Sequence, residues 1–213
     1  MVWSEGQDER RDAHMASRQD WLEAGLTVLS EDGAPALTIE RLCGRLGLTK
    51  GSFYHHFKGM AGFKTGLLAH FAAEYTTRYI DEVERSGGSP LARLEHLLTL
   101  VLAEEDERSR VEIAVRAWAA QDGEVRATQE RVDALRLDYL RSLWREAGGA
   151  EADAVPMARL LYLVLIGAGQ VVPPVAASDL REVYELAMRL APDGRTRNPS
   201  QAAGNVATPE ADS

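Results

Sequence analysis

The stretch from Gly33 to Leu68, GAPALTIERLCGRLGLTKGSFYHHFKGMAGFKTGLL, decides the fold. It predicts a short helix that Thr38 caps and Gly47 ends, followed by a second short helix that Thr49 caps. The apolar residues that can form a small core between the two helices are Ile39, Leu42, Leu46, Leu48, Phe53 and Phe57. Two short helices joined by a tight turn at Gly47–Leu48 have the layout of a helix-turn-helix.

Polar side chains crowd the second of these helices. Between positions 49 and 58 the chain carries cations, hydroxyls and ring nitrogens, at Thr49, Lys50, Ser52, Tyr54, His55, His56 and Lys58. Lysine supplies charge to phosphates, and hydroxyls hydrogen-bond phosphate oxygens. The N–H groups at the helix start favour an anion, and Gly51 allows the backbone to approach it. The segment therefore predicts a DNA-binding element; a solvated short helix in some other helical protein is the alternative.

The charge distribution agrees with this interpretation. The whole chain has a net charge of −9, but residues 33–70 hold five Lys or Arg against the single acidic residue Glu40, which gives +4 there and −13 elsewhere. All three lysines of the chain, Lys50, Lys58 and Lys64, lie in this window. A basic module on an acidic body can bind a polyanion while the body does not. Chance clustering of a few charges is the alternative.

The same segment resembles the TetR/AcrR family signature. The resemblance runs through Leu37–Ile39, Leu46–Ser52 and Phe53–Lys58, and the Tyr-His-His-Phe run after Lys-Gly-Ser is its most specific part. It covers roughly residues 18–70. The resemblance implies an all-α homodimer with an N-terminal three-helix DNA-binding domain and a larger C-terminal helical bundle that binds a small molecule.

The resemblance also implies which residues meet DNA. The implied set is Thr38, Thr49, Lys50, Gly51, Ser52, Tyr54, His55, His56 and Lys58. Of these, Lys50, Ser52 and His55 are expected nearest the base edges, and Thr38, Thr49, Tyr54, His56 and Lys58 mainly on phosphates.

One short segment departs from the family pattern. Positions 59–63 read Gly-Met-Ala-Gly-Phe, where the family usually has a polar, charged run that opens the fourth helix. Met60 stands where a basic residue is common, so a phosphate contact is lost there unless Lys64, one turn on, replaces it. Gly59 and Gly62 each cost about 1 kcal/mol of helix stability, which predicts a late or flexible helix start.

The rest of the chain also has a helical pattern. Before Gly87–Pro90 the expected helices cover about 17–31, 38–46, 49–56 and 59–85, and five longer ones follow, which makes about nine. The expected division is a disordered tail over 1–16, the helix-turn-helix domain over 17–65, a ligand-binding and dimerisation domain over 66–191, and a second disordered tail over 192–213. The acidic run Glu104–Glu107 is expected to be a solvated loop at the end of a helix.

Composition places the chain in the cytosol. It has no N-terminal apolar segment typical of a signal peptide, its single cysteine excludes an internal disulfide, and no run of about 18 apolar residues is apparent. We therefore expect a cytoplasmic protein that does not span a membrane.

The C-terminal part gives weaker signals. If it encloses a ligand cavity, as the family does, the candidate lining residues are His96, Trp118, Tyr139, Trp144, Met157, Tyr162 and Gln170. An ordinary hydrophobic core is the alternative for the large residues, and a surface histidine for His96. The last two helices, about 152–172 and 178–190, are expected to form the homodimer interface through a four-helix bundle, or else merely to complete the monomer core.

No enzyme constellation is present in the sequence. There is no G-x-S-x-G, phosphate-binding glycine loop, C-x-x-C or zinc-type histidine pair, so we expect no catalytic site, no metal and no cofactor. The predicted function is a homodimeric repressor on a palindromic DNA operator, with recognition helices about 34 Å apart, released by a small-molecule ligand. The alternative is a small-molecule-binding helical protein or an enzyme without a DNA role.

Overall fold

The computed structural model describes residues 16–103 and 105–189. Its N-terminal helices are α1 (Arg18–Asp32), the short 3₁₀ turn η1 (Ala34–Ala36), α2 (Ile39–Leu46), α3 (Lys50–His56), α4 (Gly59–Ala72), the π-helical turn η2 (Ala73–Thr77) and α5 (Arg78–Ser86). They are followed by α6 (Pro90–Ala103), α7 (Glu105–Ala119), α8 (Gly123–Glu146), α9 (Glu151–Gln170) and α10 (Ala177–Met188). Because α4, η2 and α5 follow one another without a break, these described residues form nine helices besides η1, and the all-α prediction is confirmed.

Local capping explains where the N-terminal helices begin and end. Ser17 and Asp20 form a reciprocal capping box, in which the Ser17 amide donates to the Asp20 carboxylate at 2.7 Å and the Asp20 amide donates to Ser17 Oγ at 3.2 Å. Thr38 and Thr49 cap α2 and α3 through their hydroxyls, as the sequence predicts. Gly47 ends α2 at a φ of 67°, in the left-handed region that favours glycine, and so produces the tight turn into α3.

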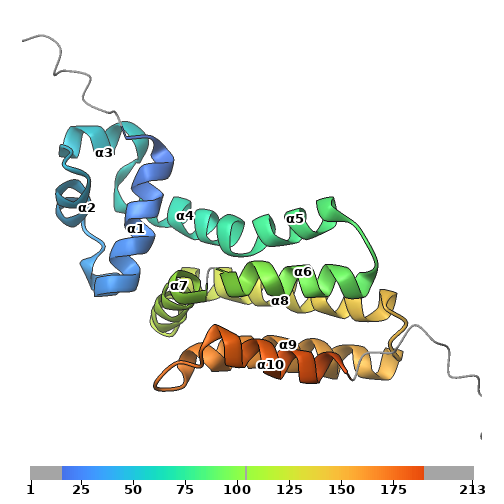
Figure 1. Cartoon of the computed structure of the whole chain (residues 1–213). Coiled ribbons are helices and arrows are strands. Elements are labelled where there is room, and N and C mark those ends of the chain that lie inside the picture. Colours follow the sequence, from blue (N-terminus) through green and yellow to red (C-terminus); the bar gives the residue numbers. More distant parts are fainter. Residues whose placement is uncertain (1–15, 104, 190–213) are drawn as a thin grey trace, which may run out of the picture.

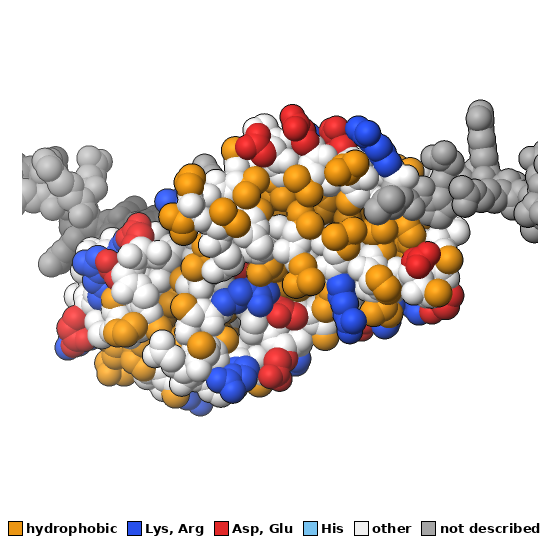
Figure 2. Space-filling view, turned by 90° about the horizontal axis from the view of Figure 1, so that it is seen from below, with side chains coloured by type: hydrophobic (Ala, Val, Ile, Leu, Met, Phe, Trp, Pro, Cys, Tyr) orange, Lys and Arg blue, Asp and Glu red, His pale blue; other side chains and the backbone are white. Residues whose placement is uncertain are grey.

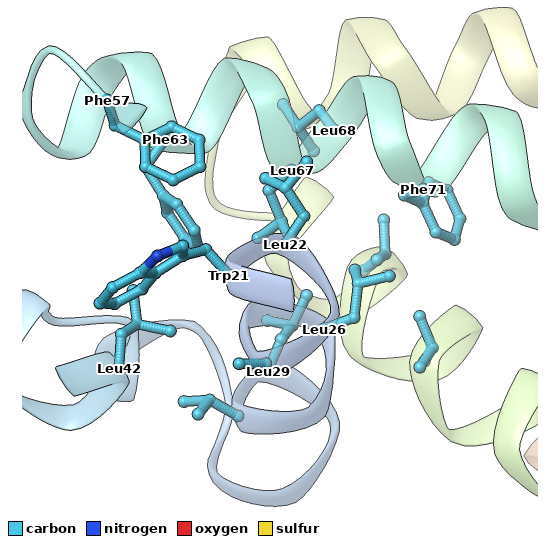
Figure 3. Close-up of a cluster of buried hydrophobic side chains, with 14 of the residues drawn as sticks. Trp21, Leu22, Leu26, Leu29, Leu42, Phe57, Phe63, Leu67, Leu68 and Phe71 are labelled. Carbon is cyan, nitrogen blue, oxygen red and sulfur yellow. The ribbon is translucent and has the colours of Figure 1, made fainter. Parts of the chain in front are cut away.

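The three N-terminal helices and α4 share one aromatic core (Figure 3). Trp21 of α1 is fully buried between Leu42 of α2 and Phe63 of α4, and its ring meets Phe53 of α3 edge-on at 5.5 Å. Phe57 closes the cluster, with ring centroids 5.1 Å from Phe63. The predicted small core between α2 and α3 is therefore present, but it is fixed by residues of α1 and α4. This packing holds α3 on a rigid base.

The remaining helices form a layered body (Figure 1). The continuous helix α4–η2–α5 runs from the N-terminal domain along α6 and α8, and α9 and α10 lie on the opposite side of that layer. Helix α7 packs against α1 on one side and α8 and α9 on the other, so it joins the N-terminal domain to the body. A second core, which includes Leu143, Leu161 and Leu180, lies between α6, α8, α9 and α10.

The structure bears on three expectations from the sequence, which concern the acidic run, the domain boundary and the two tails. Helix α7 begins at Glu105, so Glu105, Asp106 and Glu107 lie in its first turn and not in a loop. The proposed domain boundary at residues 65–66 falls inside α4. The predicted tails lie outside the described residues, except that Ala16 is buried in the N-terminal core.

Helix α9 corrects one reading of the sequence. By length and composition alone it could cross a bilayer, with a mean hydropathy of 1.4 over its most apolar window, although the sequence analysis found no such run. In the fold it packs against α7, α8 and α10, and its Tyr162 takes part in a buried polar network. The core helix of a soluble bundle meets the same criterion, so α9 gives only weak evidence of a membrane span.

Candidate functional site

The polar face of α3 points outward. Tyr54 is 58% exposed and the Lys50 side chain 60% exposed, while Phe53 of the same helix is fully buried. Thr38, Thr49, Gly51, His55 and Lys58 are also exposed, and Ser52 and His56 are partly buried. All nine residues that the sequence predicts for DNA contact thus lie on α3, at its ends or at the start of α2. They form one solvent-facing surface, which we call the α3 face.

Most cations near the α3 face already have carboxylate partners. Arg41 binds Asp32 at 2.5 Å and Arg45 binds Glu31 at 2.6 Å, which ties α2 to the end of α1. Lys50 pairs with Glu40 across the two helices. Of the five basic residues in the window 33–70, Lys58 alone has no ion pair within the part of the chain that the structure describes. The net charge of +4 therefore overstates the free positive charge, because Glu31 and Asp32 lie just outside the window.

Lys64 does not replace the missing basic residue at position 60. Its ammonium donates to both carboxylate oxygens of Asp122, at 2.6 and 2.7 Å, and lies 3.0 Å from Glu124. Burial alone would lower the pKa of Lys64, but these carboxylates raise it above its ordinary value. The indole of Trp118 lies beneath the ammonium at 5.6 Å. Lys64 thus ties α4 to the start of α8 and is unavailable to a phosphate.

The two glycines after α3 do not delay the next helix. Helix α4 begins at Gly59 itself, whose φ of 83° redirects the chain after α3. Met60 is partly buried and packs on the aromatic core. The expectation of a late start was therefore wrong, because Phe63, Leu67 and Phe71 anchor α4 to α1 and α7 and override the weak helix propensity.

The C-terminal body contains a cavity between η2, α5, α6, α8, α9 and α10. It leaves about 90 Å³ for the centres of water-sized molecules, several times what one water needs. Its wall is made of tyrosine rings and aliphatic side chains, with Thr76, Glu95, Arg108 and Arg136 as the other polar members.

Only two of the seven residues predicted for a ligand site line this cavity, namely Tyr139 and Tyr162. Trp144 and Met157 are buried in the C-terminal core, and Trp118 packs at the interface with α4. His96 Nδ1 lies 2.9 Å from Ser86 Oγ, which joins α6 to the end of α5, and Gln170 is exposed at the end of α9. The structure does not bring these seven residues together.

A buried polar network lies beside the cavity, and the sequence analysis missed it. Arg136 donates to Glu112 at 3.0 Å, to the Tyr162 hydroxyl at 3.1 Å, to Thr76 Oγ1 at 2.9 Å and to the Tyr75 carbonyl at 2.9 Å. Arg116 binds Asp133 at 2.7 Å and Glu112 at 2.8 Å. Two cations and two carboxylates therefore balance one another, as buried charges must.

The network also fixes the protonation of its members. Burial raises the pKa of Tyr162 to about 12, so its hydroxyl keeps its proton and donates to Asp133 at 2.7 Å. Burial alone would raise the pKa of Asp133, but hydrogen bonds from Arg116 and Tyr162 hold it below its ordinary value. Asp133 is therefore an anion at neutral pH.

The network is anchored to the helix that carries the N-terminal domain. Both Arg136 contacts on that helix, the Tyr75 carbonyl and the Thr76 hydroxyl, lie in the π-turn η2. Tyr75 and Thr76 also line the cavity. The cavity wall therefore shares residues with the continuous helix α4–η2–α5, whose course is drawn in Figure 1.

Comparison with known proteins agrees with this architecture. Residues 22–63 match the family model described as bacterial regulatory proteins, tetR family. The chain is 35% identical over 84 residues to the transcriptional regulator AcuR of Cereibacter sphaeroides, a match that covers 39% of this chain and 37% of that relative. The match therefore spans well under two thirds of the relative's length.

Solved structures share the fold over most of the chain. A Rhodococcus sp. protein described as a TetR-family transcriptional regulator has a TM-score of 0.69 at 22% identity, covering 82% of this chain and 97% of its own. A protein of Saccharomonospora viridis described as a transcriptional regulator, solved in complex with choline, has a TM-score of 0.69 at 17% identity, covering 81% and 95%. These relatives are described as regulators, not enzymes. Residues 22–63 therefore match the tetR family of bacterial regulatory proteins, and the chain shares its fold with solved structures described as TetR-family transcriptional regulators.

Proposed function

We propose that the protein is a cytoplasmic, homodimeric repressor that binds a palindromic double-stranded DNA operator and leaves it when a small molecule binds. The observation that carries the proposal is the α3 face, where Lys50 and Tyr54 are exposed on a helix that an aromatic core holds rigidly. A single buried face and a cationic, hydroxyl-rich outer face suit a helix that enters the major groove.

The resemblance to the TetR/AcrR family supports the following contacts for the α3 face. Lys50, Ser52 and His55 lie nearest the base edges, Thr38, Thr49, Tyr54, His56 and Lys58 bind phosphates, and Gly51 lets the backbone approach. Lys50 reaches DNA by leaving Glu40, an exposed ion pair whose stabilisation is small. On binding DNA, the Lys50 ammonium therefore exchanges the Glu40 carboxylate for a phosphate or a base.

Dimerisation is supported by an apolar surface on the last two helices. Leu163 is 65% exposed and Leu186 62% exposed, and Leu160 and Val183 are exposed beside them on α9 and α10. Figure 2 shows hydrophobic side chains gathered on this side of the body. A second copy related by a two-fold axis would cover these side chains in a four-helix bundle and set two α3 helices about 34 Å apart.

Release by a small molecule is supported by the cavity and its shared wall with η2. A ligand shifts the DNA equilibrium only if it binds one conformation more tightly, typically by 1–3 kcal/mol. The choline complex of the Saccharomonospora viridis protein supports a small organic molecule as effector.

The DNA-binding part is tested by removing Lys50 and Tyr54 together. We expect the double variant Lys50→Ala, Tyr54→Ala to lose retardation of an operator selected from a random DNA pool, with an unchanged helical circular dichroism spectrum. Arg110→Ala, which removes one exposed cation from α7, is the matched control and should bind normally. Normal binding by the double variant would refute the assignment of α3.

The dimer is tested separately. Leu163→Glu places a charge in the apolar surface of α9 and should give monomers in sedimentation equilibrium. Leu135→Glu, at an exposed leucine of α8 outside that surface, is the control and should leave the mass unchanged. Monomeric wild type would contradict the proposed assembly.

A further inference from the structure

The cavity wall combines tyrosine rings with aliphatic side chains. Five of the six tyrosines in the chain line it, the exception being Tyr54 on the α3 face. They come from five helical segments, since Tyr75 belongs to η2, Tyr79 to α5, Tyr139 to α8, Tyr162 to α9 and Tyr184 to α10. Between them, aliphatic side chains such as Leu98 and Leu165 complete the wall.

Tyrosine hydroxyls in this wall are used by the protein. Tyr139 donates to Glu84 at 2.7 Å, Tyr162 to Asp133 at 2.7 Å, and Tyr184 to the carbonyl of Leu161 at 2.6 Å. A ligand that took one of these donors would leave a carboxylate or a carbonyl without it, which is unfavourable in a buried site. The tyrosines therefore offer their rings to a ligand.

The arginine side chains at the cavity already interact with other groups of the protein. Arg136 makes four donor bonds to protein groups, and Glu112 and Asp133 balance Arg136 and Arg116. Arg108 has an interaction within the protein as well, and the Glu95 residue is largely exposed to solvent. A charged ligand would lose its hydration, an anion would find the lining arginines engaged, and a cation would find only the solvent-exposed carboxylate of Glu95, which is a weak counter-ion.

Resting on the proposed ligand-responsive function, we propose that the cavity binds an uncharged, predominantly apolar small molecule. Ring faces and aliphatic side chains supply the contacts, and no ion pair with the ligand is formed. This assigns a chemical class to the effector that the fold alone does not.

A matched series of probes tests the class. Benzyl alcohol, benzoate and benzylammonium have one ring and similar size, and at pH 7 they differ in charge. Isothermal titration of the full chain without DNA should show benzyl alcohol binding at least about tenfold more tightly than either ion. Tighter binding of benzoate would overturn the proposal in favour of an anion site at an arginine, and tighter binding of benzylammonium in favour of a cation held by the rings. Absence of binding by all three would overturn it too.

Cavity-filling variants locate the site. Leu165→Phe and, independently, Leu98→Phe should each weaken benzyl alcohol binding by about tenfold or more, because the larger ring occupies the space. Leu135→Phe is the same substitution at an exposed position of α8 and should bind like wild type. Circular dichroism identifies a variant that fails to fold, and unchanged binding by a folded cavity variant would refute the location.

The proposed DNA-binding function and the proposed ligand class are contradicted by different results. Loss of ligand binding with intact operator retardation refutes only the ligand class. Benzyl alcohol binding without operator retardation refutes the DNA-binding function and leaves the ligand class standing.

Discussion

Replacing Arg136 by methionine tests how the buried network holds the body together. The side chain is 11% exposed and makes four hydrogen bonds, and its partner Glu112 is 5% exposed. Methionine keeps the aliphatic volume but removes every donor, so Glu112 keeps Arg116 and Gln129 but loses Arg136, and the Tyr75 carbonyl also loses its Arg136 donor.

The expected cost is large for one substitution. Removing one member of a buried ion pair typically destabilises a protein by about 3–5 kcal/mol, and natural domains have only about 5–15 kcal/mol in total. With a urea dependence of roughly 2 kcal/mol per molar, the unfolding midpoint should fall by roughly 2 M. Protein concentration must be held constant, because the proposed dimerisation would make stability depend on concentration.

Arg145→Met on the same helix is the matched control. Arg145 forms an exposed ion pair with Glu151, so its loss should leave the midpoint nearly unchanged. In a double-mutant cycle, Glu112→Gln should reduce the cost of Arg136→Met by at least about 1 kcal/mol, because no uncompensated carboxylate then remains. Equal midpoints for Arg136→Met and Arg145→Met would refute the reasoning.

Three further outcomes are expected. Gly25→Ala should destabilise the N-terminal domain by about 1–3 kcal/mol in thermal unfolding, because its Cβ would lie 2.6 Å from Phe63, whereas Gly44→Ala, with open space around it, should stabilise by up to about 1 kcal/mol. Because the folded pKa of Asp133 is depressed, its contribution is complete at neutral pH and lost as pH falls below about 4, so urea titrations should show a shallower acid decline for Asp133→Asn than for wild type. Glu40→Gln should tighten operator binding several-fold at low salt in fluorescence anisotropy, because Lys50 is released and a negative charge near the phosphates is removed.

Each of these three predictions has an outcome that would contradict it. Equal stability of the two glycine variants would mean that α1 and α4 move apart at no cost. An unchanged acid decline in Asp133→Asn would remove the carboxylate from the pH dependence, and weaker binding by Glu40→Gln would mean that Glu40 positions Lys50 for DNA.

The helices of the N-terminal domain could be predicted from the sequence because the residues that begin and end each helix lie close together along the chain. Caps at Ser17, Thr38 and Thr49 and the turn at Gly47 depend on residues three or four positions apart, and all four are present in the structure. The solvent exposure of the α3 face likewise follows from one helical period. The role of Lys64 was missed because its partner Asp122 is 58 residues away.

The residues that line the cavity were harder to predict, because they come from helices that are far apart in the sequence. Large residues such as Trp144 and Met157 are equally suited to a packed core and to a cavity wall. Which of the two they form depends on how helices far apart in the sequence pack together. The five tyrosines and the charged residues at 112, 116, 133 and 136 were the available signal, since polar groups inside amphipathic helices require partners.

The unbroken helix from Gly59 to Ser86 has a mechanical consequence. From Gly59 to η2 it covers about 21 Å at 1.5 Å per residue, so a tilt of roughly 5° about the π-turn displaces the end beside α3 by about 2 Å. Hydrogen bonds tolerate only a few tenths of an ångström around about 3 Å. Under the proposed function, an effector needs to reshape the cavity only slightly, because the length of this helix magnifies that change until the two α3 faces no longer fit successive major grooves.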